Sequence, residues 1–328
     1  MGNPVANAYQ YSQVTNEIRQ TLYQASLEKQ FDNWLVGRPL FDDKTGIFPD
    51  GETLQVTLTQ DRTTYDYAEN TQVVYDGMDT TRAPLSVGAY KADAFYMTDK
   101  VKQDAWQAEA FCQENVHKSG IAMATDIETA CLAIANSGQT PADPSAIGGV
   151  PHRFRGAGTT GEITIDDIMF IKYAFDKAYV PTENRMLIVP PEAEYSLNKL
   201  LNITEVTNGS QFNFDVGGLV QTGFGEGLNI VRNIAGINIM VSHNLPDVTA
   251  ESLLKSDGSG ALAITGKTCV AMSMASDTAM PFMGVIRQRP QTEFFRNTNF
   301  KRDEWSATCR YGFAMKRPES LVSLAIPT

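Results

Sequence analysis

The residue types able to do acid–base, nucleophilic or metal chemistry are few in this chain and widely spread. Its three histidines, His117, His152 and His243, belong to no metal-binding pattern such as HExxH. The G-F-G-E-G stretch at residues 223–227 lacks the spacing of a dinucleotide-binding loop, and the sequence has no GxSxG elbow and no GxxxxGK(S/T) loop. We therefore expect no catalytic residue, no cofactor and no metal.

Two pairs of adjacent carboxylates are the other groups that could do chemistry. Asp42-Asp43 stands in a run of turn-forming residues, and Asp166-Asp167 stands where a helix is predicted to begin, so each pair has a structural explanation. One alternative stays open, an α/β enzyme with its site in residues 150–266 that uses Asp166, Asp167 or His243.

The cysteines and the lack of a membrane signal both indicate a reducing cytoplasm. The cysteines form no CxxC pair and are widely spaced, which favours buried free thiols over disulfides or zinc at Cys112, Cys131, Cys269 and Cys309. No apolar run reaches the ~18 residues of a membrane span. The first residues, MGNPVANAYQYSQ, have neither the basic start nor the apolar core of a signal peptide.

Acidic and basic side chains are unevenly distributed along the chain. The net charge of −11, from 27 Lys and Arg against 38 Asp and Glu, argues against a broad nucleic-acid-binding surface. Residues 46–97 are rich in acids and residues 285–328 in bases, which indicates either two solvated faces of a monomer or contact between the two segments of neighbouring copies. The predicted inter-subunit contacts are Asp61, Arg62, Asp66, Glu69, Asp76 and Asp79 on the first segment and Arg287, Arg289, Arg296, Lys301 and Arg302 on the second.

Residues 98–137 form the segment around which the other elements must be arranged. Thr98 suits an N-cap and Asp99 the positive end of a helix dipole. We predict one helix about 60 Å long, at ~1.5 Å per residue, with Gly120 as a place where it can bend. Its buried face is predicted from apolar and small residues that recur mostly three or four apart: Val101, Ala105, Ala108, Cys112, Val116, Met123, Ile127, Cys131 and Ile134.

A two-stranded ribbon and an earlier helix are predicted before this long helix. Residues 54–58 and 85–89 alternate apolar and polar side chains, which predicts two strands joined by a wide acidic turn. Because an isolated two-stranded ribbon is marginal in water, it should lean on its own domain or on another subunit. Residues 11–34 predict an earlier helix, with one face made of Val14, Ile18, Leu22, Ala25, Phe31 and Trp34.

A mixed α/β body is predicted after the long helix, in residues 151–266. Thr164 with Asp167 forms an approximate capping box, and Ile163 with Ile168 a hydrophobic staple, so a helix should begin there. Its buried face should comprise Ile168, Ile171, Phe175 and Ala178. A strand at 186–189, a helix at 192–201 and strands at 228–231 and 237–241 should follow.

The chain becomes strand-like again from residue 267. The predicted strands are 269–274, 282–287, 292–295, 305–315 and 321–326. We expect them to form a sheet that packs back on the long helix, so that the first domain is discontinuous in sequence.

The order of these parts resembles the major capsid protein of tailed bacteriophages, with its Hong Kong 97-type fold, over essentially the whole chain. Tyr311-Gly312-Phe313, the Lys-Arg-Pro turn at 316–318 and the last apolar strand are similar to that family's C-terminal region, and VPTENRMLIVPPEAEYSLNKLL is similar to its axial domain. The resemblance implies an α+β fold. Its expected parts are an N-terminal arm (1–45), an extended E-loop (46–97), a peripheral domain with its spine helix (98–150), an axial domain (151–266) and the returning peripheral sheet (267–328).

The function that the resemblance implies is that of a non-enzymatic shell protein of the virion. Copies would assemble in the host cytoplasm, as pentamers and hexamers, into an icosahedral capsid around double-stranded DNA. The E-loop of one subunit would lie over the peripheral domain of its neighbour. The implied partners are further copies of the chain, a separate scaffolding protein, a portal protein at one vertex and a cement protein on the outside.

Some relatives crosslink the E-loop through a lysine, but no lysine occurs between Lys44 and Lys91, so we predict no isopeptide bond. Two related alternatives stay open. One is an encapsulin-type compartment that encloses enzymes, and the other is a tail or decoration protein of the same virus.

Overall fold

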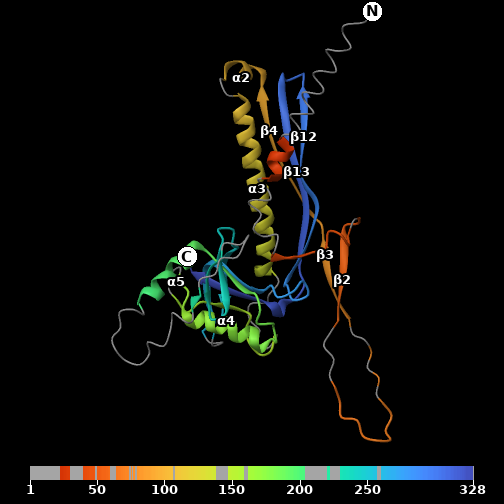
Figure 1. The fold of residues 1–328 in the computed structure, drawn as a ribbon, viewed down its shortest axis with the longest axis vertical. Helices are drawn as coiled ribbons and strands as arrows, with labels where there is room; N and C mark the ends of the chain where they lie inside the picture. Colours follow the sequence, from red (N-terminus) through yellow and green to blue (C-terminus); the bar gives the residue numbers. More distant parts are fainter. Residues whose placement is uncertain are drawn as a thin grey trace, which may run out of the picture.

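Two sheets share one long helix, α3 (Ala108–Ser137), which lies along the length of the subunit (Figure 1). One end of α3 packs on a four-stranded sheet and the other end on an eight-stranded sheet. The computed structural model describes residues 23–29, 40–48, 50–59, 64–73, 75, 77, 80–105, 108–137, 147–158, 162–203, 220–221, 230–256 and 260–327.

The four-stranded sheet has the strand order β1-β12-β13-β4. Its strands are β1 (Asp42–Asp43), β12 (Phe282–Asn297), β13 (Arg302–Met315) and β4 (Ala89–Thr98). α3 covers one face, where Cys112, Val116 and Ile127 pack with Trp305 and Cys309. The predicted packing of returning strands on the long helix is thus confirmed for β12 and β13. Burial alternates along most of β13, as expected for a sheet with one solvated face.

The segment predicted to form one long helix forms two, so that prediction is wrong. α2 (Asp99–Asp104) begins at Thr98, whose side chain accepts a hydrogen bond from the backbone N–H of Val101, and it ends at Ala105, whose backbone is extended. α2 buries no side chain; ion pairs of Asp99 and Lys102 with β12 and β13 hold it instead. Tertiary contacts of charged residues therefore set its direction. α3 is continuous through Gly120, and the predicted bend there stays a prediction.

The predicted two-stranded ribbon is present, but its second strand lies earlier than the predicted 85–89, because residues 87 and 88 are in no strand and residue 89 begins β4. β2 (Thr53–Thr59) and β3 (Thr80–Ser86) pair antiparallel, with Leu54 opposite Leu85 and Val56 opposite Ala83. The ribbon starts beside one end of β12 and β13 and extends beyond the rest of the subunit (Figure 1). Its root packs against the sheet, where Leu85 and Val87 are buried with Met283 and Val285.

The eight-stranded sheet is covered on both faces. The helices α4 (Ile165–Lys177) and α5 (Pro191–Ile203) pack on one face, and the C-terminal part of α3 packs on the other through Cys131, Leu132 and Ala135. The strand order is β5 (Arg153–Arg155), β14 (Leu321–Pro327), β11 (Leu262–Ser273), β6 (Arg185–Val189), β9 (Ile237–Val241), β8 (Ile230–Ile234) and β7 (Val220–Gln221), with β10 (Asp247–Leu253) paired to β11.

The strands after residue 267 do not form one returning sheet, which corrects the expectation from the sequence. β11 and β14 belong to the eight-stranded sheet, whereas β12 and β13 belong to the four-stranded one. The physical reason is the side-chain pattern. Every residue of β14 but the last is buried, and so is the second half of β11, as a strand between two covered faces requires. β13 buries alternate residues and suits a sheet with one open face.

Local predictions in the α/β body are confirmed. Thr164 and Asp167 form the predicted capping box at the start of α4, and Ile163 and Ile168 are both buried at the staple positions. The predicted buried face is correct except that Ala178 is only partly buried. β6, α5 and β9 also occupy their predicted places, while the predicted strand at 228–231 begins outside the described residues.

The predicted N-terminal helix is described only at residues 23–29, which are helical. Tyr23 and Leu27 are buried against the sheet and α3, whereas Ala25 is exposed. The predicted buried face is therefore wrong at Ala25, because the helix contacts its neighbours through the side that carries Tyr23 and Leu27. The other predicted face residues lie outside the described residues.

Polar contacts fix α3 to the eight-stranded sheet. Glu128 accepts hydrogen bonds from Ser242 Oγ (2.7 Å) and Asn244 Nδ2 (3.1 Å), and Arg153 donates to the carbonyl of Ala135 near the end of α3 (3.2 Å). These bonds join the helix to this sheet and to the loop that follows β9. Among the described helices, none is long and apolar enough to cross a membrane.

Candidate assembly surface

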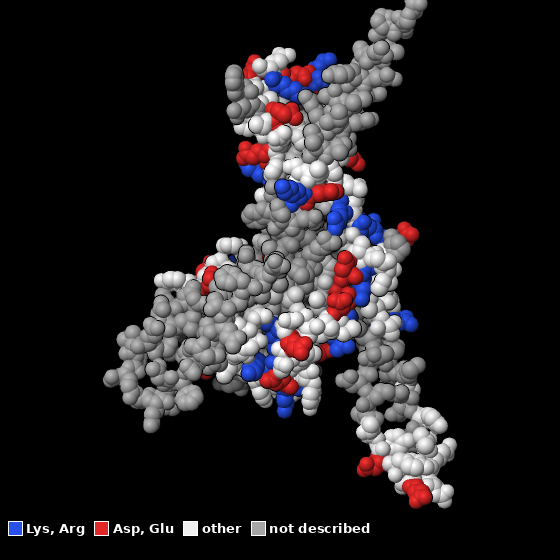
Figure 2. Space-filling view, in the orientation of Figure 1, with Lys and Arg blue, Asp and Glu red and all other residues white. Residues whose placement is uncertain are grey.

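The end of the ribbon carries exposed aromatic and acidic side chains. Tyr65, Tyr67 and Tyr75 are 53%, 57% and 88% exposed, and Asp66 and Glu69 are exposed beside them. Figure 2 shows acidic side chains at the tip of the ribbon, away from the body of the subunit. Four predicted contact residues lie outside the described residues: Asp61, Arg62, Asp76 and Asp79.

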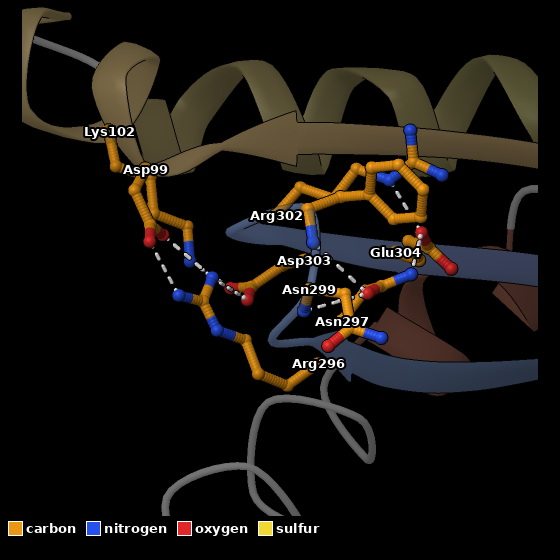
Figure 3. Close-up of polar contacts among 9 residues, drawn as sticks. Asp99, Lys102, Arg296, Asn297, Asn299, Arg302, Asp303 and Glu304 are labelled. Atoms are coloured by element: carbon orange, nitrogen blue, oxygen red, sulfur yellow. Dashed lines mark hydrogen bonds and ion pairs between the residues drawn. The ribbon is translucent and has the colours of Figure 1, made fainter.

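Arg296, one of the predicted basic contacts, has partners within its own chain. Its guanidinium donates to both carboxylate oxygens of Asp99 (2.6 Å each) and to Asp303 (2.7 Å), and Lys102 also pairs with Asp303 (Figure 3). The hydrogen bond and charge of Arg296 hold the pKa of Asp99 below its ordinary value. This cluster joins α2 to the β12–β13 hairpin.

Arg302 is also engaged within the chain. Its guanidinium lies 4.5 Å from the ring centroid of Tyr96 and 4.8 Å from that of Phe300, which are cation–π distances, and its Nε donates to Glu304 (2.5 Å; Figure 3). The hydrogen bond from Arg302 is the main cause of a lowered pKa at Glu304, which also accepts from Asn297. Arg302 therefore presents a charge that is already paired.

The remaining basic contacts divide between the ribbon root and the open surface. Arg287 donates to backbone carbonyls at the root of the ribbon. Arg289 and Lys301 are exposed, and neither makes a side-chain hydrogen bond or ion pair with a described residue. Among the described residues, these are the two of the five predicted basic side chains not engaged in a hydrogen bond or ion pair, although the charge of Lys301 contributes to the lowered pKa of Asp99. Within one subunit, no hydrogen bond or ion pair joins Asp66 or Glu69 to any of the five.

The structure has an aromatic surface that we did not predict from the sequence. It lies on the face of the four-stranded sheet that α3 does not cover. We define the open aromatic face as Tyr90, Tyr96, Phe295 and Phe300, which are between 60% and 67% exposed. Tyr96 and Phe295 lie on either side of Glu304 across the sheet, next to a hollow of about 560 Å³. The sequence did carry a signal for this surface. Adjacent aromatic residues, Phe95-Tyr96 in β4 and Phe294-Phe295 in β12, place one ring on each face of the sheet.

The groups considered for chemistry are dispersed in the fold. The ring of His117 lies 2.9 Å from Ser26 Oγ, His152 is buried, and His243 is exposed. No group of His, Cys, Asp or Glu within the described ranges could hold a metal ion. The predicted buried thiols are confirmed at all four cysteines, and burial raises the pKa of Cys309 to about 11. The glycine stretch at 223–227 lies outside the described residues.

Asp42 and Asp43 both have structural roles, and the predicted turn role applies to Asp43. Asp43 accepts a hydrogen bond from the backbone N–H of Thr45 (2.8 Å), as in an Asx turn, while buried Asp42 binds Lys316 (2.6 Å) and Lys44 (2.9 Å). Burial raises the pKa of Asp42, but the bonds and charges of Lys316 and Lys44 outweigh it and leave that pKa below its ordinary value. The pair fixes the segment before the ribbon to the end of β13.

The fold is the Hong Kong 97-type fold of phage capsids, an α+β class of shell-forming subunits. The chain belongs to the phage capsid protein family, whose sequence model matches residues 80–324. It is a major capsid protein, and the family and fold point to a structural role. No curated protein sequence matches the chain.

Solved capsid structures share this fold at low sequence identity. The capsid of the cyanophage P-SCSP1u is 16% identical, with a TM-score of 0.63, and the match covers 88% of this chain and 87% of that one. A structure from Mycobacterium phage Che8 is 20% identical, with a TM-score of 0.57 and coverage of 87% and 89%. The holo-SrpI encapsulin complex from Synechococcus elongatus PCC 7942 is 9% identical, with a TM-score of 0.58 and coverage of 89% and 86%.

Proposed function

We propose that copies of this chain assemble as pentamers and hexamers into an icosahedral capsid that encloses double-stranded DNA. The observation that carries the proposal is the contrast between the covered eight-stranded sheet and the ribbon, which extends into solvent with its tyrosines exposed. A two-stranded ribbon is marginally stable without packing, so another subunit must cover it. In this arrangement the E-loop, predicted as residues 46–97, ends before β4, which pairs with β13 in the four-stranded sheet, and it lies over the peripheral domain of a neighbouring copy.

The proposed contact on the neighbour is more aromatic and less ionic than the charge pattern suggested. Arg296 and Arg302 are paired within their own subunit, which leaves Arg289 and Lys301 for Asp66 and Glu69. The ribbon tyrosines and the open aromatic face are both exposed and of like chemistry. Aromatic burial should therefore supply most of the affinity, and the charges the orientation.

The direct test is electron microscopy of the purified protein, expressed alone and with a scaffolding protein from the same source. Closed shells of uniform size are expected in at least one of the two. A solution mass near that of the 36.0 kDa monomer under both conditions would contradict assembly. Nucleic acid in particles from infected cells supports a genome capsid, whereas enclosed enzymes would favour an encapsulin-type compartment, which the SrpI likeness keeps as the second candidate.

Charge reversal tests the proposed contact. Replacing Asp66 and Glu69 with lysine should lower the yield of shells without changing the melting temperature of the subunit, because both side chains are exposed. Glu183→Lys with Glu192→Lys is the matched control, since both acids are exposed on the α/β body. Equal shell yields from the two variants would remove the ribbon acids from the interface.

The other proposed partners rest on the family. A separate scaffolding protein, a portal protein at one vertex and a cement protein on the outside are proposed, as is assembly in the host cytoplasm. The lack of lysine between Lys44 and Lys91 argues against a covalent crosslink through the ribbon, so subunits of mature shells should separate fully on a denaturing gel.

A further inference from the structure

Both strands of the ribbon are fixed at its root, where they meet the four-stranded sheet. The backbone N–H of Val87, just after β3, donates to the carbonyl of Glu52, just before β2 (2.9 Å). Leu85 and Val87 are fully buried and pack with Phe48, Met283 and Val285. The ribbon therefore leaves the sheet from a packed core.

Two arginines bind backbone carbonyls on either side of this root. Arg287 donates to the carbonyls of Gly51 (2.6 Å) and Phe48 (3.1 Å), and its guanidinium lies 4.6 Å from the centroid of the Phe48 ring. Arg310 donates to the carbonyl of Val87 (3.1 Å). One arginine thus holds the segment that enters the ribbon and the other the segment that leaves it.

Gly312 of β13 lies where the ribbon crosses the sheet. A Cβ atom at this position would be 2.1 Å from the carbonyl oxygen of Ser86 and 2.8 Å from Cα of Val87. Both are backbone atoms, so no side-chain rotation could relieve the overlap. At Gly88, one residue beyond Val87, a Cβ atom would have no atom of the described residues within 4 Å. The crossing therefore requires a residue without a side chain at position 312, but not at position 88.

We infer that Gly312, Arg287 and Arg310 form a clamp that sets the direction of the ribbon before any neighbour is present, and thereby the angle between neighbouring subunits. The inference rests on the proposed function, in which the ribbon contacts a second copy. β2 and β3 span ~23 Å at ~3.3 Å per residue, so a 10° rotation at the root moves the far end by ~4 Å. A displacement of that size is about the spacing of adjacent strands and changes which residues meet across the interface.

The first test compares two glycine substitutions in one region. Gly312→Ala should change the distribution of particle diameters, or give open sheets in place of closed shells, at a temperature well below the melting temperature of the subunit. Gly88→Ala should give particles like those of the wild type. A clamp that merely stabilised the subunit would lower the yield and leave the diameter unchanged. Gly312→Ala shells with wild-type diameter would overturn the inference.

A second pair of variants covers the case in which Gly312→Ala fails to fold. Arg287→Met keeps an aliphatic side chain against Phe48 but loses both bonds to the backbone. Arg317→Met is the control, because it removes an exposed charge beyond the end of β13 that belongs neither to the root nor to the proposed contact. The diameter distribution should shift for Arg287→Met only. Identical distributions from both arginine variants would contradict the clamp while leaving the capsid function intact, whereas a wild type that forms no particle would contradict both.

Discussion

The two sheets that share α3 differ in how they are covered. The eight-stranded sheet is packed between α4 and α5 on one side and α3 on the other, and its central strand β6 is buried at every residue. The four-stranded sheet is covered by α3 on one face only and carries the open aromatic face on the other. The first is covered on both faces within one chain, whereas the second keeps four large aromatic side chains exposed on one face.

In the proposed assembly, this difference separates residues that stabilise the subunit from residues that contact a neighbouring copy. Truncation inside the covered sheet should lower the free energy of unfolding, while truncation on the open face should affect the shell alone. The expected change in the free energy of unfolding therefore decreases from Phe175, in the core of the covered sheet, to Phe295, on the open aromatic face.

The largest loss is expected from Phe175→Ala in α4. Phe175 is fully buried in the core between α4 and the eight-stranded sheet, so its removal leaves a cavity and should lower the free energy of unfolding by ~3–5 kcal/mol. Denaturant unfolding of the subunit measures the loss. A decrease below ~1 kcal/mol would show that this sheet is less tightly packed than its burial indicates.

Asp42→Asn should cost ~3 kcal/mol, because Lys316, itself buried, then keeps a charge without its carboxylate partner. Lys316→Met is the matched variant. It should cost less, since Asp42 keeps its ion pair with Lys44. The same unfolding measurement decides the order, and a larger loss for Lys316→Met would show that Lys44 does not compensate.

The ionisation of Asp42 makes the stability of the folded chain depend on pH. Because the pKa of Asp42 is lower in the folded than in the unfolded chain, its contribution is present above its ordinary pKa of 3.8 and is lost as the pH falls through the folded value. The melting temperature should therefore drop more steeply below about pH 4 in the wild type than in Asp42→Asn. Parallel curves for the two proteins would contradict this assignment.

A smaller loss, about 1 kcal/mol, is expected from Thr164→Ala. The hydroxyl of Thr164 accepts from the backbone N–H of Asp167 and donates to its carboxylate, so the substitution removes the capping box of α4. Thr129→Ala is the control, because Thr129 is exposed in the middle of α3 and its hydroxyl donates to the carbonyl of Thr125, one turn before it. Equal unfolding free energies for both variants would show that α4 does not need its cap.

The smallest effect on the subunit is expected from Phe295→Ala. Its side chain is 62% exposed, so the free energy of unfolding should change by less than ~0.5 kcal/mol. The yield of closed shells should nevertheless fall if a neighbour covers the open aromatic face. Normal shell yields together with normal stability would place the ribbon contact elsewhere.

Short-range features of the fold were predictable from the sequence. The capping box at Thr164, the alternation along β2 and the continuous apolar run of β6 each involve residues within one element, so their spacing alone specifies them. The candidate surface was predictable only in part. The acidic ribbon was found, but the open aromatic face was not, because a strand with aromatic residues on both sides does not show which side is covered.

The sequence by itself determined the order of the elements, the long helical segment, the ribbon and the resemblance to a capsid fold, since these depend on local spacing and on order along the chain. Only the tertiary structure decided where the helix breaks, at Ala105, and which returning strands join which sheet. It also showed that Arg287 and Arg296 have partners in their own subunit. These outcomes depend on contacts between residues far apart in sequence, which no local pattern records.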